Sequence, residues 1–179
     1  MKKIKFLAIM LLSFLSISGR LMAADPTTAS ATAKAYADIV AIVTLSKGND
    51  LVFGSLAPSG SIGNCVISTK GVRSFTNVYA GVGGTVPAAA TFNLGGKPGT
   101  SFTIGLPTSA NVYLGGVTSG ASMEVTEFEA RLESKSEDGL TGGVVGTDSY
   151  FTVGAKIAVG ASQDVGSYYG DFSVSVSYE

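Results

Sequence analysis

After about residue 23 the chain consists of short runs in which apolar and polar residues alternate, separated by glycine-rich segments. A period of two is typical of β-strands with one face in a core, and no useful window outside the first twenty-odd residues shows a helical period. The candidate strands span residues 35–45, 51–56, 65–69, 73–79, 89–94, 101–106, 112–114, 123–132, 150–159 and 168–178. This pattern predicts an all-β fold, an immunoglobulin-like or jelly-roll-like β-sandwich of roughly eight to ten antiparallel strands.

One candidate strand contains an irregularity that the sequence makes visible. In residues 123–132 the apolar positions change parity between Val125 and Phe128. Because side chains in a regular strand alternate between two faces, the change requires an extra residue near Thr126 or Glu127. We therefore expect a β-bulge at this point.

The longest alternation lies in the N-terminal part of the mature chain. Every odd residue from Ala29 to Leu45 is apolar, which corresponds to an extended stretch of roughly 54 Å, whereas a usual strand measures roughly 17–20 Å. We therefore expect the first strand of the fold to begin at Ile39. The small residues before it are a candidate donor strand, whose apolar face consists of Ala29, Ala31, Ala33, Ala35 and Ala37.

The C-terminal residues alternate in the same way. The apolar residues Phe172, Val174, Val176 and Tyr178 are separated by serines as far as Glu179. We expect the chain to end inside a strand.

The first residues have the order of an export signal. A basic start precedes an almost wholly apolar run over residues 6–17, and small residues follow at Ala23 and Ala24, a plausible cleavage point. The run is too short to span a bilayer comfortably, so we expect a cleaved signal peptide over 1–23 and no membrane insertion of the mature chain. The protein is expected in the periplasm in transit, then at the cell surface or outside the cell.

Removal of this signal leaves about 156 residues, which fits one domain. We expect a flexible extension over 24–37 and a β-sandwich over 38–179. The full chain has 12 basic and 13 acidic residues; the predicted signal contains no acidic residue and the basic residues Lys2, Lys3, Lys5 and Arg20. The mature chain therefore has a net charge of about −5, which disfavours nucleic acid and anionic membranes as partners.

Cys65 is the only cysteine, so the chain cannot form an intramolecular disulfide. It precedes Val66 and Ile67, a setting typical of a strand. We expect a buried thiol that packs as a small apolar side chain, and a reactive or intermolecular thiol is the alternative.

The residue types exclude the commonest catalytic sites. The chain contains no histidine, so a Ser-His or Cys-His pair and a histidine-bearing metal site are impossible. An acidic cluster consists of Glu124, Glu127, Glu129, Glu133, Glu137 and Asp138. We interpret it as a solvated strand face because its carboxylates alternate with apolar residues; weak cation binding and glycosidase-type chemistry are the alternatives. We expect no enzyme activity, no metal and no cofactor.

Two other features have alternative interpretations. Residues 95–100 place glycine beside Lys97, but Pro98 follows where a phosphate-binding loop requires Ser or Thr, so we expect a turn between strands. Tyrosines could provide a stacking platform for a glycan, although tyrosine is equally a common strand residue. The tyrosines considered for this platform are Tyr36, Tyr79, Tyr113, Tyr150, Tyr168 and Tyr169.

Several segments resemble a family of exported bacterial domains catalogued as domain of unknown function 4402. The similar segments are 50–55, 89–96, 101–107, 150–155 and 163–178, and the last is the most specific. The resemblance covers nearly the whole mature chain. The family has no settled biochemical role, so the resemblance implies no mechanism.

The C-terminus is also similar to that of chaperone-usher pilus subunits. The shared features are a penultimate aromatic residue, Tyr178, a glycine fourteenth from the end, Gly166, and alternating apolar residues between them. This resemblance implies that Gly166, Phe172, Val174, Val176 and Tyr178 form a strand that a periplasmic chaperone recognises during export, with an usher as a further partner.

Together these patterns predict a structural or adhesive cell-surface subunit, similar to fimbrial subunits, that assembles by β-strand addition. Its partners would be further copies or other surface subunits. The alternative is a self-contained secreted β-sandwich that binds glycan or protein without polymerising, and a secreted enzyme is a third possibility. Subunit and binder differ in whether the final strand is paired internally, which the sequence leaves open.

Overall fold

The computed structural model describes residues 30–39, 42–133, 138–143 and 149–178, and the chain divides into two units, Met1–Asp38 and Ile39–Glu179. In the first unit the described residues 30–38 form neither helix nor strand, and their side chains are exposed. The signal peptide predicted over 1–23 lies outside the described residues. All the described strands belong to the second unit.

The second unit is built from β-strands, and no described residue is helical. Its thirteen described strands are β1 (Thr44–Lys47), β2 (Leu56–Pro58), β3 (Gly63–Ile67), β4 (Arg73–Thr76), β5 (Val78–Ala80), β6 (Ala90–Gly95), β7 (Ser101–Gly105), β8 (Ser109–Leu114), β9 (Ser122–Leu132), β10 (Thr141–Gly143), β11 (Ser149–Val159), β12 (Tyr168–Tyr169) and β13 (Ser175–Tyr178). Within these ranges there is no helix of the length and hydropathy needed to cross a bilayer.

The largest sheet has eight strands and curls into a half-barrel. Its main path is β1-β6-β11-β9-β8-β12, while β3 pairs with the second half of β11 and carries β4 on its other side. Strands β10-β7-β13 form a three-stranded sheet, and β2-β5 form a two-stranded ribbon. The described pairings are antiparallel, which confirms the predicted all-β, antiparallel fold.

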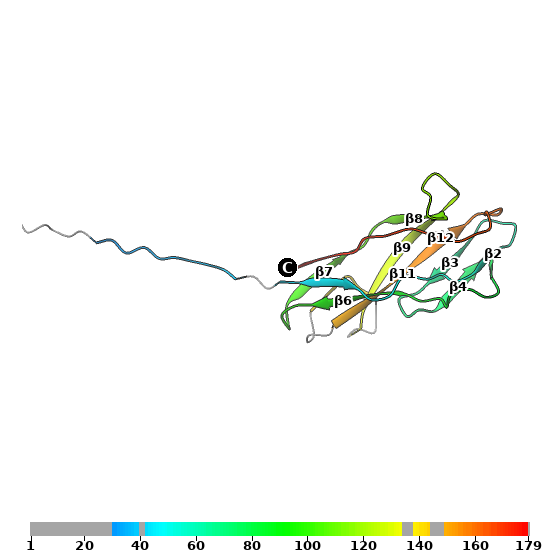
Figure 1. Cartoon of the computed structure of the whole chain (residues 1–179). Helices are drawn as coiled ribbons and strands as arrows, with labels where there is room; N and C mark the ends of the chain where they lie inside the picture. The colour runs from blue at the N-terminus through cyan, green and yellow to red at the C-terminus, as the bar shows by residue number, and fades with distance from the viewer. Residues whose placement is uncertain (1–29, 40–41, 134–137, 144–148, 179) are drawn as a thin grey trace, which may run out of the picture. The chain divides into compact units, whose positions relative to one another are not determined.

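The C-terminal segment runs along β8 and β7 for the length of the domain (Figure 1). Tyr168 in β12 pairs with Leu114 in β8, and Tyr178 in β13 pairs with Phe102 in β7. Residues 170–174 between β12 and β13 belong to no strand. One segment therefore belongs to both the curled sheet and the three-stranded sheet.

The bulge predicted near Thr126 or Glu127 is confirmed. Gly154 of β11 lies opposite Glu129, but Lys156 lies opposite Thr126, so β9 has one residue more than its partner at this point. Glu127 has a φ of 50° and forms an ion pair with Lys156. The extra residue lets apolar side chains of both parities in β9 face the core.

The core consists of two neighbouring clusters. The first lies between the three-stranded sheet and β6, β9 and β11; its buried residues are Ala90, Leu94, Phe102, Ile104, Ala130, Leu132, Phe151 and Val153. The buried residues of the second are Cys65, Ile67, Ala89, Val125, Ala155 and Ile157. Leu51 and Phe128 pack against both clusters and so connect them.

Four phenylalanine rings connect the C-terminal segment to the curled sheet. Phe92 in β6 stacks on Phe151 in β11 with ring centroids 5.3 Å apart. Phe172 contacts Phe92 edge-on at 6.1 Å and Phe128 in β9 at 5.1 Å. Such pairs add to the stabilisation that burial alone provides, so Phe172 fixes the C-terminal segment over two strands of the sheet.

The predicted first strand is longer than the observed one. The sequence predicts a strand over 35–45 that begins the fold at Ile39, but β1 contains only Thr44–Lys47. Residues 30–39 are exposed and lie outside strands. Their small alanine side chains bury little surface, so alternation without a partner edge does not make a strand there.

Other strand boundaries also differ from the prediction. The strand predicted over 73–79 divides into β4 and β5 at Asn77, whose φ is 52°. The strand predicted over 168–178 divides into β12 and β13. The sequence does not predict β10, because two of its three residues are glycines, which have low strand propensity.

We expect Phe151→Ala to lower the free energy of unfolding by about 3–5 kcal/mol, because the ring is fully buried and its loss leaves a cavity. Urea unfolding monitored by circular dichroism measures this change. The control is Val82→Ala, since Val82 is fully exposed and its loss should change stability by less than about 0.5 kcal/mol. Equal effects of the two substitutions would contradict the assigned core.

Candidate functional site: a groove between the first and last segments

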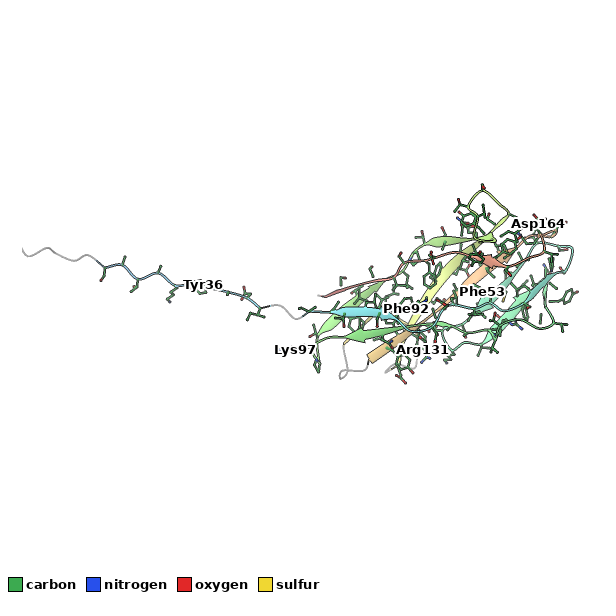
Figure 2. The ribbon with its side chains drawn as sticks, in the orientation of Figure 1. Tyr36, Phe53, Phe92, Lys97, Arg131 and Asp164 are labelled. Atoms are coloured by element: carbon green, nitrogen blue, oxygen red, sulfur yellow. The ribbon has the colours of Figure 1, made fainter. Side chains whose placement is uncertain are left out.

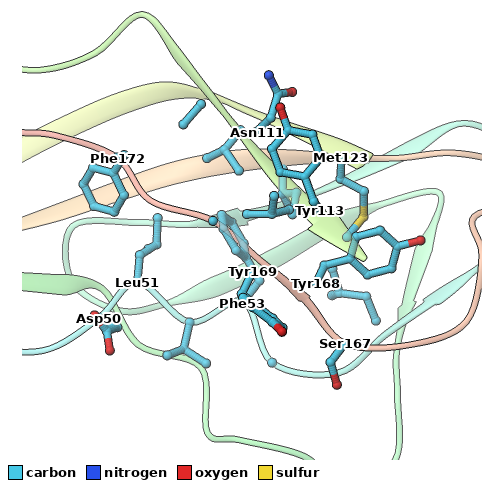
Figure 3. A pocket seen from close by; sticks show the side chains of 18 of the residues that line it. Asp50, Leu51, Phe53, Asn111, Tyr113, Met123, Ser167, Tyr168, Tyr169 and Phe172 are labelled. Atoms are coloured by element: carbon cyan, nitrogen blue, oxygen red, sulfur yellow. The ribbon is translucent and has the colours of Figure 1, made fainter. Parts of the chain in front are cut away.

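A groove of about 1240 Å³ separates the first extended segment of the domain from the last. The first rim comprises β1, residues 48–55 and β2, and the last rim comprises residues 163–172, which continue into β13. Figure 3 shows the side chains that these rims contribute, among them Leu51, Phe53, Tyr168, Tyr169 and Phe172.

The floor of the groove is apolar. It is formed by side chains of β6, β8, β9 and the end of β11, namely Ala90, Phe92, Val112, Met123, Val125, Phe128, Ile157 and Val159. Phe92 and Phe128 pack against the core but remain partly exposed. Covering such apolar surface contributes about 25 cal/mol per Å², so the floor gains stability from any further chain laid over it.

Backbone hydrogen bonds hold the first rim to the strand beside it. Val52 exchanges two backbone hydrogen bonds with Ala88, and the Gly48 N–H donates to the Thr91 carbonyl at 2.7 Å. These contacts lie on the same side as the pairing of β1 with β6. Residues 49–55 of this rim line the groove.

The strand predicted over 51–56 is interrupted within this rim. Gly54 has a φ of 74°, a conformation that ends a regular strand. The Arg73 guanidinium donates a hydrogen bond to the Phe53 carbonyl at 3.0 Å, which satisfies a backbone group that a strand partner would otherwise satisfy. The rim is therefore extended without being a continuous strand.

Close contacts with β8 and the turn after it hold the last rim. The Tyr169 hydroxyl donates to the Gly115 carbonyl at 2.6 Å, and the Gly115 N–H donates to the Ser167 carbonyl at 2.8 Å. A Cβ added at Gly170 would collide with the Asn111 carbonyl. Absence of a side chain at this position therefore permits the rim to approach β8 so closely.

Each rim has one paired and one unpaired edge. Among the described strands, β1 pairs only with β6, β12 only with β8, and β13 only with β7. The final strand β13 is therefore paired along one edge and unpaired along the other. Internal pairing of this strand was expected to distinguish an assembling subunit from a self-contained binder, and pairing along a single edge is compatible with both. Lys47 of β1 and Tyr168 and Tyr169 of β12 line the groove, so each rim contains a strand with an unpaired edge.

The groove lining includes three carboxylates and one amine. Lys47 and Asp50 lie on the first rim, and Asp164 and Asp171 lie on the last. Lys47 Nζ donates to Asp50 Oδ1 at 2.7 Å, and this contact, assisted by the charge of Asp171, raises the pKa of Lys47 above its ordinary value. The charge of Asp171, on the last rim, is the smallest of these causes.

The structure places the predicted donor face outside any strand. Ala31, Ala33, Ala35 and Ala37 are exposed, and Ala29 lies outside the described residues. The alternation of the N-terminal segment therefore has no partner edge among the described residues of its own unit.

The predicted C-terminal residues lie on or beside the groove. Gly166 and Phe172 line it, and Val174 and Val176 are partly buried against the first core cluster. The backbone of Tyr178 pairs with β7. The sequence did not identify the first rim: the shared parity of Leu51 and Phe53 is a signal for it, but parity does not say which strands are neighbours.

Three of the candidate tyrosines lie at the groove. Tyr113, Tyr168 and Tyr169 line the groove, but Tyr79 and Tyr150 do not. The Tyr168 hydroxyl already donates to the Asp164 carbonyl at 2.9 Å.

The acidic cluster follows an exposed face. Glu124, Glu127, Glu129 and Glu133 are exposed along β9 and the turn after it, and Glu137 lies outside the described residues. Asp138 accepts a hydrogen bond from the Thr69 hydroxyl at 2.6 Å. The described ranges contain no group of three or more acidic or cysteine side chains that could hold a metal ion.

The groove lies within the part of the chain that matches a known family. The family described as Domain of unknown function (DUF4402) matches residues 43–178, which include both rims and the floor. The chain belongs to this family. The resemblance to this family seen in the sequence is thereby confirmed. No curated protein and no solved structure matches the chain.

We expect Gly166→Ala to lower the free energy of unfolding by about 1–3 kcal/mol. Gly166 has a φ of 152°, and an added Cβ would collide with the side chain of Leu114. Gly139→Ala is the matched control, because a Cβ there meets no atom within 4 Å. Thermal unfolding of the two variants measures the difference, and equal melting temperatures would show that the last rim tolerates a side chain at this position.

We expect Cys65 to be inert in the folded protein. Burial raises the pKa of its thiol to about 11, although the positive charge of Arg73 opposes the shift. At pH 8 only about one thiol in a thousand is then the reactive thiolate. Mass spectrometry after iodoacetamide treatment should find Cys65 unmodified in native protein and modified in denaturant, with Thr32→Cys as an exposed positive control. Rapid native modification of Cys65 would support a reactive thiol instead.

Proposed function

We propose that this protein is an exported structural or adhesive subunit of the cell surface that assembles by β-strand addition into the groove. The observation that carries this proposal is that β1 and β12, each paired along one edge only among the described strands, both contribute residues to a groove with an apolar floor. A single added strand can pair with both edges and cover the partly exposed rings of Phe92, Phe128 and Phe172. Backbone pairing and apolar burial are thereby gained in one step.

The strand that we propose for the groove is the segment 27–37 of a second copy. Its odd residues from Ala29 to Ala37 are alanines, and the described residues 30–37 are exposed. Large rings already occupy the floor, so small side chains fit above them without the strain that larger ones would cause. The alanine face therefore complements an apolar floor that includes the rings of Phe92 and Phe128.

The ends of the groove can be identified from the pairing of the strands. Thr44 in β1 pairs with Gly95, and Tyr178 in β13 pairs with Phe102, so both lie at the end where the Lys97 turn joins β6 to β7. Figure 2 shows Lys97 and Asp164 at opposite ends of the domain. The first and last segments run in opposite directions, because each step along the sheet between them is antiparallel.

The direction of the added strand decides whether it can come from the same chain. We call the segment 27–37 the arm. If the arm runs antiparallel to the last rim, Asp38 at its end reaches the Asp164 end of the groove, whereas β1 of the same chain begins at the other end. From Tyr178 back to Ser167 the extended chain covers roughly 36 Å, but the link 39–43 spans at most roughly 20 Å. An arm in this direction must therefore belong to another copy.

This direction gives an open, head-to-tail assembly. We call the copy that supplies the arm the donor and the copy whose groove is filled the acceptor. The donor's domain would lie beyond the Asp164 end of the acceptor. The acceptor's own arm is connected to its domain at Ile39, just before β1. Each copy then has one occupied groove and one free arm, which is a heterologous contact that extends without closing. Residues 39–43 would keep successive domains close together.

An exposed apolar groove also accounts for the proposed partners during export. Large exposed apolar patches cause association in transit, and a chaperone strand in the groove would shield them. The C-terminal similarity to chaperone-usher subunits supports a periplasmic chaperone and an usher, which would act on the strand containing Gly166, Phe172, Val174, Val176 and Tyr178. Further copies or other surface subunits would replace the chaperone strand.

We expect deletion of residues 27–37 to leave the domain folded but unable to assemble. Ala33→Asp should likewise reduce assembly about tenfold or more, because it places an unpaired charge over the apolar floor. The measurements are the amount of exported protein and the fraction that migrates as a ladder on unheated gels.

Two controls separate assembly from folding. Thr32 is an even residue, so in the proposed strand its side chain points away from the floor. The Thr32→Asp variant should therefore retain most of the assembly. Val176→Asp, by contrast, should reduce the yield of folded exported protein, since Val176 packs against the core. If the deletion variant assembles like the parent, or if the parent stays monomeric at every concentration and with a co-expressed chaperone, the self-contained binder replaces this proposal.

A further inference from the structure

We propose that an ion pair between Lys34 of one copy and Asp171 of the next sets the register of strand addition. This inference rests on the proposed function, and it specifies which residues of the arm and of the last rim lie opposite each other. The occupant is a second copy of this chain, and the argument combines side-chain parity with charge complementarity.

Parity places both charges on the same face. In the arm the odd alanines face the floor, so the even residue Lys34 faces outward. In the last rim Phe172 packs inward against the core, as does Val174 in its continuation, so the odd residue Asp171, which is exposed, faces outward. In an antiparallel ladder, residues directly opposite each other share a face, so Lys34 and Asp171 can pair.

Pairing these two residues fixes every other pair along the ladder. The inward pairs become Ala33 with Phe172 and Ala31 with Val174. The outward pairs become Thr32 with Ser173 and Ser30 with Ser175. Each large apolar residue of the rim is thus opposite an alanine, and each serine is opposite a small hydroxyl residue, which suits close packing on both faces.

A slip of two residues removes the charge pairing while preserving parity. With a slip in one direction, Lys34 would lie opposite Ser173 and Asp171 opposite Tyr36. With a slip in the other direction, Lys34 would lie opposite Tyr169 and Asp171 opposite Thr32. A repetitive face of alanines would tolerate such a slip, because its inward residues are identical. The single lysine therefore supplies register information that the alanines lack.

The local charge balance favours the same pair. Lys34 is the only basic residue of the segment 24–38, and the groove lining carries three carboxylates but a single amine, Lys47. Lys47 is engaged with Asp50, and the charge of Asp171 acts on it from the opposite rim. When Lys34 of the second copy is in place, two amines, Lys34 and Lys47, face two carboxylates, Asp171 and Asp50.

A charge reversal tests the pair in the full exported chain. We expect Lys34→Asp and Asp171→Lys each to raise the concentration needed for half-maximal assembly by about two- to fivefold or more at low salt, since exposed ion pairs have modest strength. The double variant should restore assembly to nearly the parent level, and added salt should reduce all the differences. Asp164→Lys is the matched control, because Asp164 lies beyond the arm in this register and should not rescue Lys34→Asp.

Cysteine cross-linking reports the register directly. Residues directly opposite each other lie within disulfide distance, whereas diagonal neighbours are roughly 7–8 Å apart. A chain carrying Thr32→Cys and Ser173→Cys should give a disulfide ladder on non-reducing gels. A chain carrying Thr32→Cys and Ser175→Cys should give little. The buried thiol of Cys65 should not interfere.

The outcomes separate this inference from the proposed function. A ladder from the shifted pair, or assembly unaffected by charge reversal at both positions, overturns the register while leaving strand addition in place. A ladder from Ser30→Cys with Ser167→Cys would show an arm parallel to the last rim, which also overturns it. Absence of intermolecular cross-links in every variant, together with a monomeric parent, overturns both proposals.

Discussion

A curled antiparallel sheet with two unpaired ends is the constraint on which the rest of this structure depends. Strand β1 at one end and the C-terminal segment at the other are each paired along a single edge. Curling brings residues of both segments to one groove. Backbone groups left unpaired on a strand edge favour a further strand, and here two edges favour the same one.

The floor of the groove shares several side chains with the core of the domain. Phe172 belongs to the last rim, yet its ring contacts Phe92 and Phe128, which pack against the buried cluster around Phe151. These rings hold the last segment in place and also provide the apolar surface that remains partly exposed. Replacing these rings by polar residues would therefore also weaken the packing of the core. By the same argument, a strand added over them would stabilise the core.

The glycines of the last rim and the bulge of β9 show how local geometry shapes the groove. Gly170 permits close approach to the Asn111 carbonyl, and Gly166 avoids a collision with Leu114. The bulge at Glu127 turns β9 so that Val125 and Phe128, which differ in parity, both face the groove. The last strand, β13, is paired with β7 along one of its two edges, and the other edge has no partner among the described strands. Internal pairing of this strand therefore does not by itself exclude strand addition.

The sequence by itself determined the all-β class, the bulge near Glu127, the turn at Lys97 and the alternation of the last strand, because each depends on parity or turn chemistry within a few residues. It also identified Phe172, Val174 and Val176 as an inward face. Tertiary structure alone decided that Leu51 and Phe53 lie across a groove from that face. It also shortened the first strand to Thr44–Lys47 and divided the last one. Neighbour relations between distant strands depend on how the sheet curls, and parity along one strand carries no information about which edge it meets.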